Sequence, residues 1–245
     1  MAFAKAANKD YIIFFNIIQE NMVMKNKLPE IKLNCAGDIE CIIQRAVSLL
    51  AKSESSHDLD HTLRVLHNAE KLLAVHPEAD ADVVRLSALL HDTARPAEDA
   101  QCGKCCHAEL SAIFAETILS DAGVPDNIRS RIVNAVKRHR FRRGEAPDTL
   151  EAKILYDADK LDSLGAVGLG RAFLFAGHCN ARLHNTEKEA LSAPPYSRED
   201  TAYREYLVKL RFVPEKMFTA EGKKIAAEKL QFMQEFFSVL ESEIG

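Results

Sequence analysis

The stretch Leu86-Ser-Ala-Leu-Leu-His91-Asp92-Thr93 places an adjacent histidine and aspartate at the end of an apolar helical run. Burying an imidazole and a carboxylate beside leucines costs several kcal/mol unless both groups are satisfied, and one divalent cation satisfies both. Neighbouring side chains on a helix point about 100° apart, so His91 and Asp92 can reach one ion but cannot complete its coordination shell. The remaining ligands must come from other segments.

Two other segments carry metal-capable side chains inside apolar helical patterns. In residues 56–65, His57 and His61 lie four positions apart and share one helix face. In residues 154–162, Asp157 and Asp159 lie about 200° apart around a helix, so only one of them can face an ion. The three segments together predict a metal site built from separate helices.

The apolar periodicity predicts an all-α protein with no strands. The expected helices cover residues 38–53, 58–75, 80–94, 106–122, 126–140, 149–177, 200–212 and 219–243. Gly123 suits a helix C-cap, and residues 178–199, with few periodic apolar positions, are expected to form an exposed loop.

The order His61, then His91-Asp92, then a helical aspartate resembles the HD-domain superfamily of metal-dependent phosphohydrolases, and most closely its YedJ/YpgQ-like branch. The resemblance covers roughly residues 40 to 243. It rests on these motifs: His57-Asp-x-x-His61-x-x-Arg64-Val65, Ala88-Leu-Leu-His91-Asp92, His107-Ala-Glu-Leu-Ser111-Ala112, His139-Arg-Phe141 and Ala158-Asp159-Lys160-Leu161-Asp162. It implies an HD-domain helical bundle with a metal site in the core.

The resemblance also assigns metal ligands. They fall on His61, His91, Asp92 and Asp159, with Asp157 as the competing choice for the last position. Two imidazoles and two carboxylates suit a six-coordinate Mn, Mg, Fe, Co or Ni ion that keeps positions for water and a phosphate oxygen. The implied reaction is hydrolysis of a small phosphorylated substrate, in particular a nucleoside triphosphate cleaved to monophosphate and pyrophosphate.

Several other residues are expected to act on the substrate. Asp92, Asp58 and Arg95 are the expected catalytic residues, with Asp58 or Glu109 positioning or deprotonating water. The expected substrate-binding residues are Arg64, His107, His139, Arg140 and Lys160. In binuclear relatives, histidines at the positions of His107 and His139 hold a second ion, so that role stays open. The basic residues 138–143 form either a phosphate-binding rim or a solvated helix end.

Composition limits the domain organisation and the partners. A chain of 245 residues, 47% hydrophobic and without a long Gly/Ser/Pro linker, predicts an N-terminal extension over residues 1–37 and one domain over 38–245. A net charge of −4 argues against binding long nucleic acid. The sequence contains no run of 18 apolar residues, so no membrane span is expected. Whether the chain forms a homodimer stays open.

Six cysteines without a convincing export signal favour free thiols and a cytoplasmic location. The cluster Cys102-Gly-Lys-Cys105-Cys106-His107 resembles half of a zinc knuckle, but no second Cys-x-x-Cys completes it. Inert loop thiols, a structural zinc and a redox-sensitive pair are the alternatives for these cysteines.

Two other functions fit parts of the pattern. The spacing of His57-Asp58 and His61 resembles the His-Glu-x-x-His helix of zinc peptidases, but that alternative leaves His91-Asp92 unexplained. A noncatalytic metal-bearing protein that senses nucleotides is the other alternative. Metal content and a phosphate-release screen separate all three.

Overall fold

The structure, a computed structural model, describes residues 34–51, 59–101, 105–141 and 145–244. Within these residues the chain is helical and contains no β-strand, which confirms the predicted all-α fold. The helices are α2 (Ile39–Leu50), α3 (Leu59–Leu73), α4 (Ala81–Leu90), α5 (Arg95–Ala100), α6 (His107–Asp121), α7 (Asp126–Arg138), α8 (Leu150–Leu161), α9 (Gly165–His178), α10 (Glu187–Ser192), α11 (Ala202–Val208) and α12 (Ala220–Ile244), with short 3₁₀ turns at Leu210–Phe212 and Pro214–Lys216.

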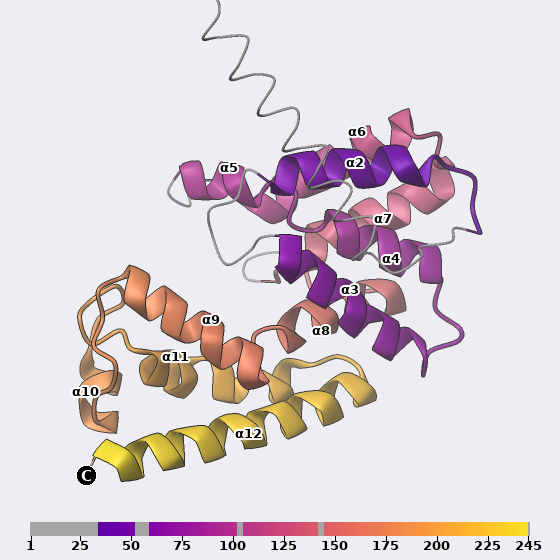
Figure 1. Cartoon of the computed structure of the whole chain (residues 1–245). Helices are drawn as coiled ribbons and strands as arrows, with labels where there is room; N and C mark the ends of the chain where they lie inside the picture. Colours follow the sequence, from indigo (N-terminus) through magenta and orange to yellow (C-terminus); the bar gives the residue numbers. More distant parts are fainter. Residues whose placement is uncertain (1–33, 52–58, 102–104, 142–144, 245) are drawn as a thin grey trace, which may run out of the picture.

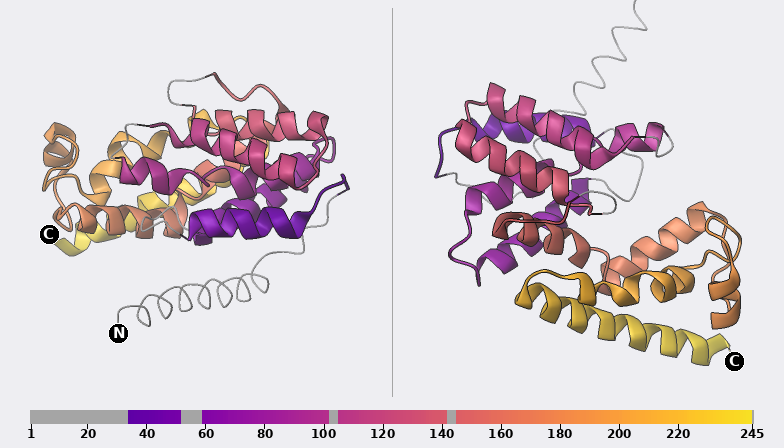
Figure 2. Two further views of the ribbon diagram at one scale, coloured as in Figure 1. Left: turned by 90° about the horizontal axis from the view of Figure 1, so that it is seen from above. Right: turned by 180° about the vertical axis from the view of Figure 1, so that it is seen from behind.

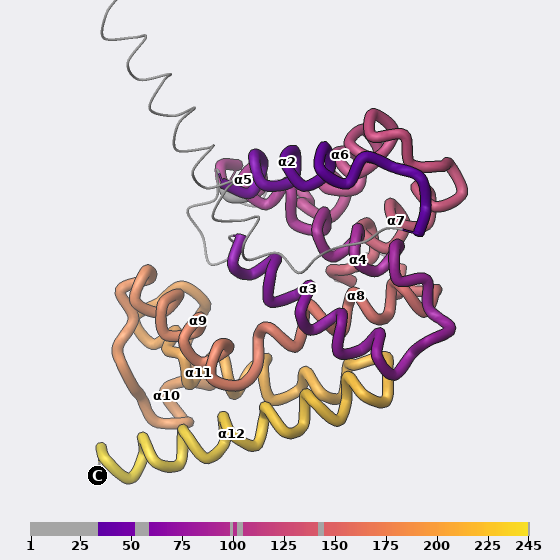
Figure 3. The backbone as a smooth tube through the Cα atoms, turned by 45° about the vertical axis from the view of Figure 1, so that its right-hand side comes forward, coloured from indigo at the N-terminus to yellow at the C-terminus, as the bar shows by residue number. Residues whose placement is uncertain are grey.

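The helices form two groups (Figure 1). Helices α2 to α8 make a bundle in which α6 packs against α7, α3 against α8, and α4 against both α3 and α7. Helices α9 to α12 make a second group beside this bundle, and the view from behind shows the long α12 running along its outer side (Figure 2). The backbone trace in Figure 3 shows α8 at the junction, followed directly by α9.

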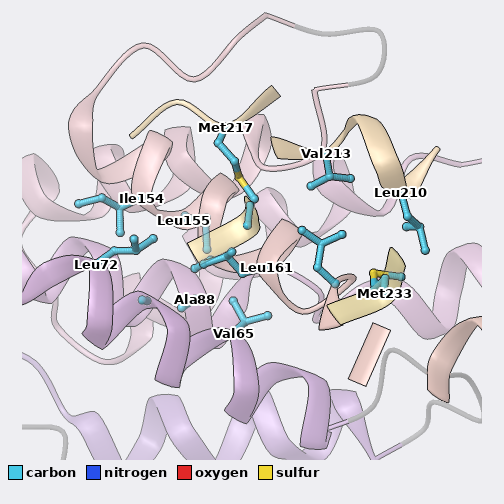
Figure 4. Packing of buried hydrophobic residues seen from close by; sticks show 14 of the residues in the cluster. Val65, Leu72, Ala88, Ile154, Leu155, Leu161, Leu210, Val213, Met217 and Met233 are labelled. Carbon is cyan, nitrogen blue, oxygen red and sulfur yellow. The ribbon is translucent and has the colours of Figure 1, made fainter. Parts of the chain in front are cut away.

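The structure has two apolar cores, one within the bundle and one that joins the bundle to the C-terminal helices. One cluster joins α2, α4, α6 and α7, and includes Ile42, Leu86, Leu119 and Ile132. The other joins α3 and α8 to the C-terminal group, where Leu155 and Leu161 meet Met217 and Met233 (Figure 4). Since α4 contributes to both clusters, its C-terminal end, with His91 and Asp92, lies between them.

The expected single helix over 149–177 is wrong, because the chain breaks between α8 and α9. The Ser163 hydroxyl donates to Lys160 O at 2.7 Å, and Gly165 begins α9 with φ +71°, a left-handed conformation that favours glycine. Lys229 of α12 donates to Leu161 O at 3.0 Å. The break turns the chain away from the bundle directly after Asp159 and Asp162.

Other boundaries also differ from the expectation. The expected 80–94 helix stops at Leu90, and the short helix α5 follows it. The expected loop 178–199 contains α10, whose start is fixed by a capping box between Thr186 and Glu189. Gly123 has φ +75° and follows the C-cap of α6, as predicted. Six-residue helices carry too few apolar repeats to be detected by periodicity.

The described helices do not test the predicted division into an N-terminal extension and one domain. Residues 1–33 of the predicted extension lie outside the described residues. The first described helix begins at Ile39, with the Asp38 side chain accepting from Cys41 N. The division between 1–37 and 38–245 therefore stays a prediction.

Candidate metal centre

Four histidines from four helices meet in the bundle. His61 lies in the first turn of α3, His91 directly follows α4, His107 begins α6 and His139 directly follows α7. All four are buried, each with at most 3% of its surface exposed. Four buried imidazoles in one place need partners for both ring nitrogens.

In each histidine one ring nitrogen, Nδ1, is held by an oxygen acceptor. The acceptors are Asp162 Oδ2 for His61 at 2.7 Å, Ala88 O for His91 at 2.8 Å, Glu98 Oε2 for His107 at 2.6 Å and Val136 O for His139 at 2.7 Å. Because carbonyl and carboxylate oxygens only accept, each Nδ1 carries a proton, and in the neutral imidazole Nε2 then presents a lone pair. Metal-binding histidines in proteins are oriented in this way.

The first cluster brings together His61, His91 and Asp159. His61 Nε2 lies 3.3 Å from His91 Nε2 and 3.5 Å from Asp159 Oδ1. Asp92 Oδ2 completes the group, at 3.5 Å from His61 Nε2 and 3.6 Å from His91 Nε2. These are the four residues that the resemblance implied as ligands.

The second cluster brings together Asp92, His107 and His139. Asp92 Oδ1 lies 3.1 Å from His107 Nε2 and 3.5 Å from His139 Nε2, and the two imidazole nitrogens are 3.2 Å apart. The two oxygens of Asp92 thus face different clusters. One carboxylate joins both groups of potential ligands.

Both clusters have the spacing of metal ligands. Two donor atoms that each lie about 2.1 Å from an ion are about 3.0 to 3.4 Å apart when they subtend a right or tetrahedral angle. The measured separations of 3.1 to 3.6 Å are close to this range. Imidazole nitrogens with carboxylate oxygens suit divalent first-row metals, so the residues fit such an ion in each cluster.

The electrostatics favour the ligand forms of these groups. Burial lowers the pKa of His91 to about 4, so its imidazole is neutral at pH 7. Burial alone would raise the pKa of Asp159, but Lys160 and the nearby histidines outweigh it and hold that pKa well below its usual range. Lys160 Nζ lies 2.6 Å from Asp159 Oδ2.

Asp157, the alternative last ligand, faces the opposite way. Its carboxylate accepts from Phe218 N at 2.9 Å, Thr219 N at 2.8 Å and Thr219 Oγ1 at 2.7 Å. These contacts cap the segment that begins α12. The side chain near the histidines is that of Asp159.

Asp162 supports His61 from behind. Besides the His61 ring it accepts from Arg64 Nε at 2.6 Å and from an Arg171 guanidinium nitrogen at 2.6 Å. Burial alone would raise the pKa of Asp162, but hydrogen bonds from His61 and Arg64 lower it well below the usual range. Arg64, expected to bind substrate, is therefore engaged with this carboxylate.

The expected phosphate-binding arginines Arg95 and Arg140 meet at Glu98. Glu98 Oε1 accepts from Arg140 at 2.5 Å, and Glu98 Oε2 lies 3.2 Å from Arg95. Burial opposes the charge of Glu98, but the hydrogen bonds from Arg140 and His107 lower its pKa to about 2. Arg138 pairs with Glu145 and donates to Ala146 O, away from the histidines.

Glu98 is a residue that the sequence pattern missed. It lies on a six-residue helix and shares no helical spacing with the histidines. Asp58, expected to act on water, lies outside the described residues, as do His57 and Cys102. Neither metal-ligand cluster found among the described residues includes Cys105 or Cys106.

Comparisons with known proteins show the family of this chain. The sequence profile of the HD domain matches residues 58–164. YpgQ of Bacillus subtilis (strain 168), named as an uncharacterized protein, is 31% identical over 201 residues, which are 80% of this chain and 89% of YpgQ.

Solved structures share the architecture. The crystal structure of Bacillus subtilis YpgQ in complex with ADP matches with a TM-score of 0.63 at 27% identity, over 82% of this chain and 92% of that chain. A predicted HD superfamily hydrolase from an uncultured Thermotogales bacterium matches with a TM-score of 0.61 at 25% identity, over 84% and 93%.

Among the described helices, none combines the length and the apolar character needed to cross a bilayer.

Proposed function

This chain belongs to the HD domain family, and we propose that it is a metal-dependent phosphohydrolase that acts on nucleotides, with nucleoside triphosphates as its first substrates. The observation that carries the proposal is Asp92, whose two oxygens face two groups of ligand-competent side chains. The relative YpgQ was crystallised with ADP, which supports a nucleotide as the ligand. Cleavage to monophosphate and pyrophosphate is the reaction we infer.

We propose that both clusters hold a divalent ion. His61, His91, Asp92 and Asp159 would hold the first ion, and Asp92, His107 and His139 the second. Bound ions would supply a water of lowered pKa and would neutralise charge that develops on the phosphate oxygens. Manganese, magnesium, iron, cobalt and nickel all accept such nitrogen and oxygen ligands.

The chain itself supplies the positive charge for a polyphosphate. Lys160 lies at Asp159, with its ammonium 5.1 Å from the centre of the Tyr156 ring. Arg95 and Arg140 lie at the side of His107, where each has a guanidinium nitrogen within 3.4 Å of the imidazole Nδ1. A guanidinium has five N–H groups, so the contact with Glu98 does not use all the donors of Arg140. These cations would bind and orient the phosphates.

The test is a screen of nucleotides, cyclic nucleotides and sugar phosphates with each metal, read by both phosphate and pyrophosphate release. We expect nucleoside triphosphates to turn over with pyrophosphate as product, and Asp92→Ala to abolish turnover. Asp126→Ala is the matched control, because the Asp126 side chain is 91% exposed on α7. If no phosphate compound turns over while metal is bound, the protein is a noncatalytic metal-bearing sensor.

A further inference from the structure

Glu98 connects the second cluster to two of the expected phosphate-binding residues. It belongs to α5, is only 6% exposed, and contacts three side chains through its two oxygens. Oε1 accepts from Arg140 at 2.5 Å. Oε2 lies 2.6 Å from His107 Nδ1 and 3.2 Å from Arg95.

His107 depends on a side chain for its Nδ1 acceptor, as His61 depends on Asp162, whereas His91 and His139 do not. His91 and His139 hold their Nδ1 protons on carbonyls one turn earlier in their own helices, at Ala88 and Val136. His107 is the first residue of α6, so its own helix offers no earlier carbonyl. Its Nδ1 acceptor is the Glu98 carboxylate from another element.

The surroundings of His107 Nδ1 would otherwise favour the wrong tautomer. Guanidinium nitrogens of Arg140 and Arg95 lie 3.2 Å and 3.4 Å from Nδ1. Both are donors and have no acceptor capacity. Without Glu98, an unprotonated Nδ1 would be the better partner for them, and the proton would move to Nε2, which then could not ligate a metal.

We propose that Glu98 is the positioning residue of the second metal site: it keeps the proton of His107 on Nδ1, so that Nε2 faces Asp92 and His139 as a ligand. The same carboxylate holds Arg95 and Arg140 beside that site, where a substrate phosphate would meet them. This inference rests on the proposed two-ion function. It assigns to one glutamate both the formation of the second site and the placement of its cations.

The test is a calorimetric titration of the metal-free protein with manganese, together with electron paramagnetic resonance of the manganese-loaded protein. Wild type should bind two ions per chain and give the spectrum of a coupled pair. Glu98→Gln leaves one side-chain oxygen for the three side chains that Glu98 contacts. We expect this oxygen to accept from Arg140, so that the amide nitrogen turns toward His107. We expect the second ion to bind at least about tenfold more weakly, and the mononuclear spectrum to replace the coupled one.

Three comparisons make the result specific. Glu116→Gln, on the same helix as His107, removes an exposed carboxylate that pairs with Arg129 and should change nothing. Glu98→Asp keeps the carboxylate and should retain more of the second ion than Glu98→Gln does. This variant also keeps the inference testable if Glu98→Gln folds poorly. Glu98→Gln with Arg140→Gln removes a competing donor and should recover part of the lost affinity, which a merely structural role does not predict.

Two outcomes overturn the inference in different ways. If wild type binds two ions and Glu98→Gln binds both with unchanged affinity, Glu98 is not a positioning residue, while the proposed function stands. If wild type binds a single ion, the second site does not exist, and hydrolysis by a one-ion enzyme is then tested by the substrate screen alone.

Discussion

Replacing Asp157 by Asn should destabilise the protein and leave its metal content intact, whereas Asp159→Asn should remove metal with little effect on the stability of the metal-free protein. The two residues are neighbours on α8 with opposite surroundings. Asp157 accepts two backbone N–H groups and one hydroxyl at 2.7 to 2.9 Å. Asp159 lies against Lys160 and His61.

The size of the Asp157 effect follows from these contacts. Loss of a helix cap costs about 0.5–2 kcal/mol, and a buried donor left without an acceptor costs about 1–3 kcal/mol. Burial raises the pKa of Asp157, which means that desolvation of its carboxylate opposes folding and offsets part of the stabilisation from its hydrogen bonds. An asparagine keeps one acceptor oxygen. We therefore expect the free energy of unfolding to fall by about 2–4 kcal/mol.

Urea unfolding measured without metal, together with elemental analysis of the purified variants, tests this prediction. Thr219→Val removes the hydroxyl that donates to Asp157 and should lower stability in the same direction by a smaller amount. An Asp157→Asn protein with unchanged unfolding and lost metal would show that the wrong aspartate has been assigned to the metal site.

Other substitutions test the surroundings of the site. Asp162→Asn should weaken binding of the first ion by about 10- to 100-fold, because it weakens the hydrogen bond that orients the His61 ring. An unchanged affinity in a metal titration would contradict this prediction. Arg95→Ala should leave the metal content unchanged and raise KM or lower kcat by about tenfold, as expected for the loss of one charge-assisted hydrogen bond to the substrate. Unchanged kinetics would exclude Arg95 from substrate binding. Replacing Cys102, Cys105 and Cys106 together by Ser should leave metal stoichiometry and Tm nearly unchanged, and loss of one zinc per chain would reveal a structural site.

The sequence predicts the helical fold and the histidines for the same reason. His91 and His139 directly follow helices with clear apolar repeats, and His61 lies near the start of another. Periodicity locates such elements well, and the order of the motifs relates them to a family. Helix geometry shows only that Asp157 and Asp159 cannot both face one ion, since they lie about 200° apart; the preference for Asp159 comes from the resemblance to the family.

What the sequence does not predict depends on contacts between distant segments. Glu98 reaches His107 only because α5 folds back beside α6, and nothing in its spacing indicates this. The break at Gly165 depends on a local left-handed conformation and on Lys229, which lies more than 60 residues away along the chain. The contact of Arg64 with Asp162 joins residues 98 positions apart, and the role of Arg64 in substrate binding stays a prediction.

The account rests on Asp92 serving two ion sites, and X-ray diffraction at the manganese absorption edge tests this directly. Crystals grown with manganese should give two anomalous peaks on either side of Asp92, one among His61, His91 and Asp159 and the other between His107 and His139. A peak at only one of these positions, at neither of them, or at Asp157 would contradict the account.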